Sequence, residues 1–313
     1  MRTTSLYTAL PLIALFAGTA AAQEVACTKQ LKMVDEIQME SRGPGPSSVP
    51  VEINGTKQAL TFATATPFTQ ISEAMAQSLG LPVADKQITV SKLTFGKLEG
   101  TNVKMPVMGG RGGRGGRGGP GDPAGPGGGA GWLGLNHMLS YDVDVDFGTD
   151  KLKFFDQDHC PGGVLYWQAS VVGVMPITIS NGRVTVPVMI DGKELTGVID
   201  TTATGLNVKE AVAEKILGLA PGMEGKTHTG TLALGTIGLK NTRFNLVTNG
   251  AQVGGSAVAS AINRSSAMQF AVAQPEVIIG MDLLRKLHLY MAFGEKKLYV
   301  TPASPRPAAT NTN

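Results

Sequence analysis

The residue best placed to do chemistry in this sequence is Asp200, which ends an apolar stretch and is followed by Thr201, Thr202 and Ala203. A carboxyl group at the end of a buried strand can act on a bound substrate as a general acid or base. Two carboxyl groups held about 3 Å apart divide these roles, because they cannot both ionise at that distance. The residue that faces Asp200 therefore decides what this site does.

An internal duplication identifies the position equivalent to Asp200 in the other half of the chain. Four pairs of stretches match in the same order: 49–55 with 186–192, 62–66 with 199–203, 93–98 with 232–237, and 133–139 with 279–285. Collinear matches of this kind indicate a duplicated domain. In the repeat, Ala63 and Thr64 stand where the second copy has Asp200 and Thr201, so the first copy is a degenerate counterpart without the acid.

The elements that must position these residues are short strands with few helices. Alternating apolar residues predict strands at 49–53, 58–62, 87–95, 102–108 and 141–147, and again at 177–179, 184–190, 195–199, 289–293 and 297–300. Apolar residues spaced for one helical face predict helices at 71–79, 208–217 and 283–287. We therefore expect an all-β fold with short helices, built as two similar lobes.

Composition separates the ends of the chain from the lobes. Residues 1–22 combine a basic start, an apolar run too short to span a bilayer, and small residues, which is typical of a secretory signal peptide. We expect a periplasmic or secreted protein divided into a lead-in (23–48), a first lobe (49–160), a second lobe (170–302) and a disordered tail (303–313). The Gly/Arg-rich insert at 109–131 is interpreted as a surface loop in preference to an RNA-binding segment.

Several other chemistries find no support. The formal charge is only +3 and includes three arginines of the insert, so we expect no nucleic-acid partner. The sequence contains no His-Glu-x-x-His, Cys-x-x-Cys, Gly-Lys-Ser/Thr or Gly-x-Ser-x-Gly motif, and its four histidines are scattered. We expect no metal ion, no cofactor, and no membrane contact once the signal peptide is removed.

Three acids alternate along one predicted strand: Asp142, Asp144 and Asp146. Alternate residues of a strand share one face, so these side chains are expected to lie together. We interpret that face as solvated in preference to a cation site.

The two cysteines of the chain are Cys27 and Cys160. In an oxidising compartment they are expected to form a disulfide, although two free thiols remain the alternative. The disulfide would tie the start of the mature chain to the end of the first lobe.

The order of these motifs resembles the retropepsin-like aspartyl protease family, in a bacterial exported form with two repeats in one chain. The resemblance extends over nearly all of 49–300, and its most specific pieces are 198–204, 277–284, 133–139 and 141–148. It implies two tandem closed β-barrel lobes in a bilobal acid-protease fold, with a peptide-binding cleft between them. It also implies an Asp-Thr-Gly-Ala signature in each lobe, in which the threonine holds the loop by hydrogen bonds.

This chain departs from that signature in both lobes. The first lobe has Ala63 for the acid and Ala65 for the glycine. The second lobe keeps Asp200 and Thr201, but Thr202 replaces the glycine, and its side chain is expected to crowd the carboxylate. Asp200 is then the sole remaining catalytic candidate, with Thr201 as its support. Because a joint catalytic unit loses nearly all of its acceleration when one member is removed, we expect no cleavage by the dyad mechanism.

Three other acids are weak surrogates for the missing one. Asp191 belongs to a predicted hairpin turn, Asp282 is expected to cap a helix, and Glu52 is expected on the solvent face of a strand. Pairing of two Asp200 residues in a homodimer is disfavoured because the second lobe already occupies that face, so we expect a monomer.

Three functional hypotheses follow. The first is an aspartyl protease-like protein of the cell envelope whose endopeptidase activity is impaired or absent. The second is a non-catalytic module that binds a peptide or protein segment in the inter-lobe cleft, since strand-like backbone bonds to a ligand do not require the catalytic acids. The third is a purely structural role for the retained fold.

Overall fold

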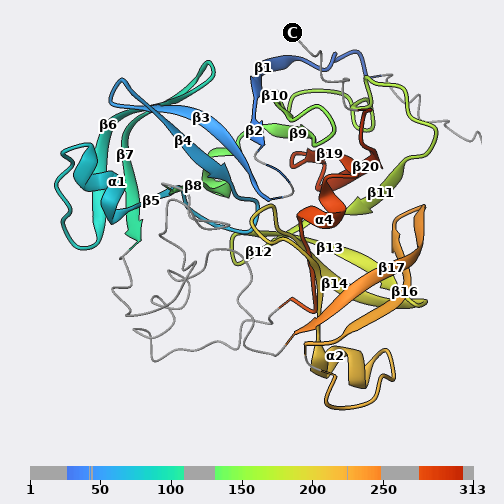
Figure 1. The fold of residues 1–313 in the computed structure, drawn as a ribbon. Coiled ribbons are helices and arrows are strands. Elements are labelled where there is room, and N and C mark those ends of the chain that lie inside the picture. Colours follow the sequence, from blue (N-terminus) through green and yellow to red (C-terminus); the bar gives the residue numbers. More distant parts are fainter. Residues whose placement is uncertain are drawn as a thin grey trace, which may run out of the picture.

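The computed structural model describes residues 27–41, 43, 45–108, 131–223, 225–247 and 275–305. The expected signal peptide, nearly all of the Gly/Arg-rich insert and most of the expected tail lie outside these residues. Strands dominate the described part of the chain, with a few short helices between them (Figure 1). This confirms the predicted all-β class.

The first lobe is a closed barrel of six strands. Its hydrogen-bonded neighbours follow the order β3-β4-β8-β5-β7-β6, and β6 pairs back with β3 to close the ring, while the short β2 attaches outside β3. The strands are β2 (Glu40–Ser41), β3 (Ser47–Ile53), β4 (Thr56–Phe62), β5 (Gln70–Ser72), β6 (Gln87–Phe95), β7 (Leu98–Met108) and β8 (Gly131–Leu133).

The second lobe repeats this barrel strand for strand. The order is β13-β14-β18-β15-β17-β16, closed by the pairing of β16 with β13, and β12 attaches outside β13. The strands are β12 (Thr178–Ser180), β13 (Arg183–Ile190), β14 (Lys193–Ile199), β15 (Leu206–Lys209), β16 (Thr227–Leu234), β17 (Ile237–Val247) and β18 (Val277–Ile279). The prediction of two closed barrel lobes is therefore confirmed.

The sequence of each lobe's first hairpin explains its register. In β3, Val49, Val51 and Ile53 are buried at every second position, so a slip of one residue would turn the apolar face outward. The hairpin turns at Asn54–Gly55 and Asp191–Gly192 have φ values of 50° and 81°, and of 48° and 76°. These are the left-handed conformations that Asn-Gly and Asp-Gly adopt in two-residue turns, so the predicted turn at Asp191 is present.

A third sheet joins the two lobes. Its order is β1-β10-β9-β19-β20-β11, and the pairing of β9 with β19 links a strand of each half (Figure 1). The strands are β1 (Met33–Gln38), β9 (Asp142–Asp146), β10 (Lys151–Phe155), β11 (Gly173–Pro176), β19 (Leu287–Ala292) and β20 (Lys297–Pro302). Each half contributes three strands, so the duplication extends to this sheet.

The helices are short and begin later or earlier than expected. α1 (Glu73–Ser78) starts after Ser72, whose Oγ accepts a hydrogen bond of 3.1 Å from the Met75 N–H, and α2 (Glu210–Lys215) likewise follows a strand. α4 (Met281–Leu284) has Gly280 at its N-cap, so the capping role expected of Asp282 is wrong. Among the described residues, no helix is long and apolar enough to cross a membrane.

The interpretation of Asp142, Asp144 and Asp146 as a solvated face is wrong. Their exposed fractions are 0%, 0% and 4%. Asp142 Oδ2 lies 2.6 Å from His159 Nε2, and Asp144 Oδ2 lies 2.8 Å from His288 Nε2. A buried carboxylate requires such partners, because transfer out of water is costly for an unpaired charge.

The physical reason is the connection between the two lobes, residues 156–172, which covers this face of the sheet. Val164 and Trp167 of the connection pack against Tyr290 in a separate apolar cluster. Tyr166 donates a hydrogen bond of 3.0 Å to Asp144 Oδ2. The connection has no apolar periodicity, so its position over the sheet was not readable from the sequence.

The predicted disulfide between Cys27 and Cys160 is confirmed, with Cα atoms 5.6 Å apart. It joins the segment before β1 to the connection between the lobes. By closing a span of 133 residues, the disulfide restricts the unfolded chain and holds β1 at the sheet edge.

We predict that His159→Leu destabilises the protein by about 3–5 kcal/mol at neutral pH, the range for removing one member of a buried ion pair. Burial opposes the charge on His159, but the hydrogen bonds to Asp142 and to the Cys160 carbonyl, together with the charges of Asp142 and Glu295, outweigh it and raise the pKa of the imidazole. The substitution leaves the Asp142 carboxylate buried without this partner. Urea unfolding measures the loss.

The matched control is His228→Leu. His228 pairs with Asp191 at 3.0 Å, but this pair is partly exposed, with side-chain exposures of 24% and 36%. Its removal is expected to cost at most about 1 kcal/mol. Equal losses in the two variants would contradict the structural role assigned to the buried pair.

Candidate active site

Two equivalent loops meet where β4 and β14 end. The Ala63 N–H donates to the Leu133 carbonyl of β8 at 3.1 Å, and the Asp200 N–H donates to the Ile279 carbonyl of β18 at 3.0 Å. Both loops thus leave a strand that runs parallel to its neighbour, β4 beside β8 and β14 beside β18. The backbone places residues 63 and 200 in the same environment of each lobe.

Thr64 and Thr201 bind the two loops to each other. The Thr64 hydroxyl donates to the Ile199 carbonyl at 2.7 Å, and the Thr201 hydroxyl donates to the Phe62 carbonyl at 2.5 Å, so each reaches into the opposite lobe. Each hydroxyl also accepts from the other threonine's N–H, at 3.2 and 3.3 Å. Both side chains are buried. These mutual hydrogen bonds, the Thr64–Thr201 network, set the Ala63 and Asp200 loops side by side at the seam between the lobes.

Asp200 is fully buried, and its two oxygens differ in their surroundings. Oδ1 accepts hydrogen bonds from the Thr202 N–H at 2.9 Å, the Thr202 hydroxyl at 2.7 Å and the Ala203 N–H at 3.3 Å. Oδ2 has no hydrogen-bond partner among the described residues. Burial outweighs these bonds and raises the pKa of Asp200. The carboxyl group is therefore biased toward its neutral form.

Thr202 plays a different part from the one expected. A side chain at the position of the family's glycine was expected to crowd the carboxylate; here its hydroxyl bonds to Oδ1. On the other side of the seam, Ala65 packs in a small apolar cluster with Val198, Ile278 and Ala203. The space around Asp200 is thus occupied by a hydroxyl on one side and by methyl groups on the other.

The surrogate acids lie elsewhere. Asp191 accepts from the Thr231 N–H at 2.7 Å in its hairpin turn, Asp282 is exposed on α4, and Glu52 is half-exposed on β3. The part of the chain that the structure describes contains no cluster of three or more metal-ligating side chains. Among the described residues, the groups bonded to Asp200 are hydroxyl and backbone N–H groups.

The charged side chain that acts on Asp200 is Arg183, which the sequence reasoning did not single out. The β13–β14 ladder ends where Thr185 pairs with Val198, so Arg183 and Asp200 each lie two residues beyond its last pair. Arg183 is 8% exposed. Burial lowers the pKa of its guanidinium, and the Asp200 charge opposes that shift. The register of the predicted hairpin was the signal that could have identified it.

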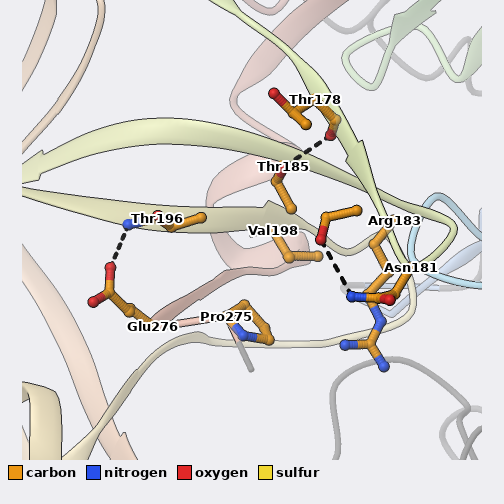
Figure 2. A pocket seen from close by; sticks show the side chains of 9 residues that line it. Thr178, Asn181, Arg183, Thr185, Thr196, Val198, Pro275 and Glu276 are labelled. Carbon is orange, nitrogen blue, oxygen red and sulfur yellow. Dashed lines mark hydrogen bonds between the residues drawn. The ribbon is translucent and has the colours of Figure 1, made fainter. Parts of the chain in front are cut away.

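Arg183 also lines a pocket of about 410 Å³ beside the seam. Figure 2 shows its side chain extending from the β12–β13 hairpin, with Pro275 and Glu276 across the pocket. At the hairpin tip, a Cβ added to Gly182 would come within 2.2 Å of the Pro67 Cβ, so this wall of the pocket abuts the first lobe.

Comparison of the sequence with known proteins finds no matching family model and no matching curated protein. Among solved structures, similar chains include an aspartic proteinase from Irpex lacteus and conglutin gamma, a basic 7S globulin from lupine seeds. The proteinase is 12% identical, covers 88% of this chain and 99% of its own, and has a TM-score of 0.47. For conglutin gamma the values are 9%, 88%, 96% and 0.49. Values this low carry no argument about activity, which must come from the chain's own residues.

We predict that Asp200→Asn becomes more stable relative to the unchanged protein as the pH rises. A carboxyl group whose pKa is raised by folding stabilises the protein below its unfolded pKa, about 3.9, and this contribution is lost as the pH rises through the folded pKa. The asparagine does not titrate. The difference should therefore grow by at most about 1.4 kcal/mol per pH unit across that window, measured by urea unfolding at a series of pH values.

Asp191→Asn is a control of opposite sign. Burial raises the pKa of Asp191 slightly, but the hydrogen bonds from Thr231 and His228 outweigh it, so the pKa is lowered. Its carboxylate stabilises the protein above the unfolded pKa, and this variant should lose relative stability as the pH rises. A flat difference for Asp200→Asn would show that its carboxyl group is not shifted by burial.

Proposed function

We propose that this chain is a retropepsin-like, aspartyl protease-like protein of the cell envelope that binds an extended peptide or protein segment at its inter-lobe seam and has impaired or absent peptidase activity. The observation that carries the proposal is the Thr64–Thr201 network of hydrogen bonds, with Ala63 on one side and Asp200 on the other. The apparatus that positions a pair of acids is kept, and one of the acids is missing.

The chemistry of the site argues against dyad catalysis. A water molecule held between two carboxyl groups needs one as base while the other protonates the substrate carbonyl. Asp200 alone, biased toward its neutral form, is a poor base, and its Oδ1 is already occupied by three donors. Loss of one member of such a unit lowers the rate by about 10⁴-fold or more.

Peptide binding is supported by the edge of the second barrel. β12 is the outermost strand of its sheet, and in the described part of the chain no strand pairs with its outer side. Thr178 and Ser180 of β12 line the pocket beside the seam, and Ile179 is 39% exposed. An extended peptide can add to such an edge through backbone hydrogen bonds.

Export to the periplasm or the cell exterior remains part of this proposal. The disulfide between Cys27 and Cys160 supports an oxidising compartment, and the composition of residues 1–22 supports secretion. We also propose that the protein is a monomer, because each barrel already has the other at the face that bears Ala63 and Asp200.

We predict that the mature protein binds members of a random peptide library without cleaving them, from acid to neutral pH. Mass spectrometry of retained and released peptides measures both properties. The physical reason is the absence of a second carboxyl group beside Asp200. Cleavage that disappears in Asp200→Asn would overturn the proposal.

Restoration of the signature is the stronger test. The triple variant Ala63→Asp, Ala65→Gly and Thr202→Gly supplies the second acid and removes the Thr202 hydroxyl bond to Asp200. We expect it to gain peptidase activity at acid pH, because the Thr64–Thr201 network already positions both loops. The matched control adds Asp200→Asn to the triple variant and should abolish the gain.

A further inference from the structure

Arg183 is a buried cation that forms no ion pair within the part of the chain that the structure describes. It is 92% buried, and it forms no ion pair or hydrogen bond with any residue that the structure describes; its Nε is a buried donor without a partner. The charge that acts on Arg183 is that of Asp200. Burial raises the pKa of Asp200 and so favours the uncharged form of this carboxyl group. A buried charge that is not paired is costly, so a ligand that supplies the opposite charge would be favoured here.

The acid of the pocket does not neutralise Arg183. Glu276 is turned toward β14, where its Oε2 accepts a hydrogen bond of 2.6 Å from the Thr196 N–H, as Figure 2 shows. Lys209, one residue beyond the β15–β18 ladder, is 9% exposed and adds a second positive charge near Arg183. The charge of Glu276 acts on Lys209, so these two side chains together leave the guanidinium charge unbalanced.

The rest of the pocket wall offers neutral hydrogen-bond donors. Ser180 Oγ accepts from the Asn181 amide at 3.2 Å, so its own hydroxyl proton remains available. The Thr185 hydroxyl is occupied, since it donates to the Thr178 carbonyl at 2.7 Å. A guanidinium flanked by one or two neutral donors matches a carboxylate, which it can bind with two parallel hydrogen bonds. A phosphate dianion calls for more positive charge than one arginine in contact supplies.

The pocket also has the right place and size. Its volume of about 410 Å³ admits a short side chain or a chain terminus. Val198 of its floor packs against Ala65 of the first lobe, so the pocket opens beside the seam where an extended segment on β12 would run.

We propose that this Arg183 pocket anchors a carboxylate of the bound peptide, supplied either by its C-terminus or by an acidic side chain. The proposal rests on the proposed function, because it names the group that the peptide-binding site recognises. Arg183 is the binding residue, and it acts by charge and by directed hydrogen bonds to the carboxylate.

Isothermal titration of the mature protein with small probes tests the anchor separately from peptide binding. N-acetylalanine carries only a terminal carboxylate, the α-amide of N-acetylglutamic acid carries only a side-chain carboxylate, and N-acetylalaninamide carries neither. We expect one or both acids to bind, no binding of the neutral amide, and weaker binding of inorganic phosphate. Equal binding of acid and amide, or tighter binding of phosphate than of either acid, would overturn the carboxylate assignment.

Substitution then locates the site. Arg183→Gln should weaken binding of the acid that binds by on the order of tenfold or more, because the charge and the paired donors are lost. Arg183→Lys keeps the charge but not the two parallel donors of the guanidinium, so its affinity for the acid should lie between those of the unchanged protein and Arg183→Gln. Arg243→Gln, at an exposed position of β17, is the control and should bind as the unchanged protein does. An unchanged affinity in Arg183→Gln places the acid elsewhere and refutes the proposal.

Library peptides separate the two proposals. Loss of affinity on converting a peptide's carboxylates to amides, removed by Arg183→Gln, supports both. Peptides that bind equally as acids and amides leave the proposed function standing and refute the anchor. Small acids that bind at Arg183 in a protein that retains no library peptide support the anchor and refute the proposed function.

Discussion

The reciprocal hydrogen bonds between Thr64 and Thr201 are the constraint on which the site depends. Each hydroxyl donates to a carbonyl of the opposite lobe and accepts an N–H from the opposite threonine, so four hydrogen bonds satisfy six buried polar groups. Leaving any of them unpaired would cost about 1–3 kcal/mol. The Thr64–Thr201 network involves hydroxyl and backbone groups only. The arrangement of the two loops is therefore independent of the acids that such loops can carry.

That independence explains how one acid can be absent while the frame persists. An aspartate at residue 63 would place a second carboxyl group beside Asp200, where only one of the two could ionise. Alanine removes that repulsion and leaves Asp200 with Thr202 as its donor. The nearby cation, Arg183, interacts with the Asp200 charge but forms no ion pair or hydrogen bond with any residue that the structure describes.

Local pattern and duplication account for much of what the sequence predicted. The alternation of Val49, Val51 and Ile53 determines a strand face, and the repeat identifies Ala63 as the equivalent of Asp200. What the sequence did not reveal depends on segments far apart in the chain. β1 pairs with β10 more than a hundred residues later, and the burial of Asp142 and Asp144 is imposed by a connection without periodicity. Arg183 lies beside the site because both it and Asp200 follow the last pair of the β13–β14 ladder.

The β9–β19 pairing limits how this molecule can move. Both halves of the chain contribute strands to this one sheet. A hinge rotation of one lobe against the other would therefore have to break backbone hydrogen bonds between β9 and β19 at the centre of the sheet. The Thr64–Thr201 network adds a second point of attachment between the lobes. Two separated attachments suppress rigid-body opening, so access to the seam must come from short-range rearrangement at its margins. Ligand exchange should accordingly be governed by local flexibility and not by domain closure.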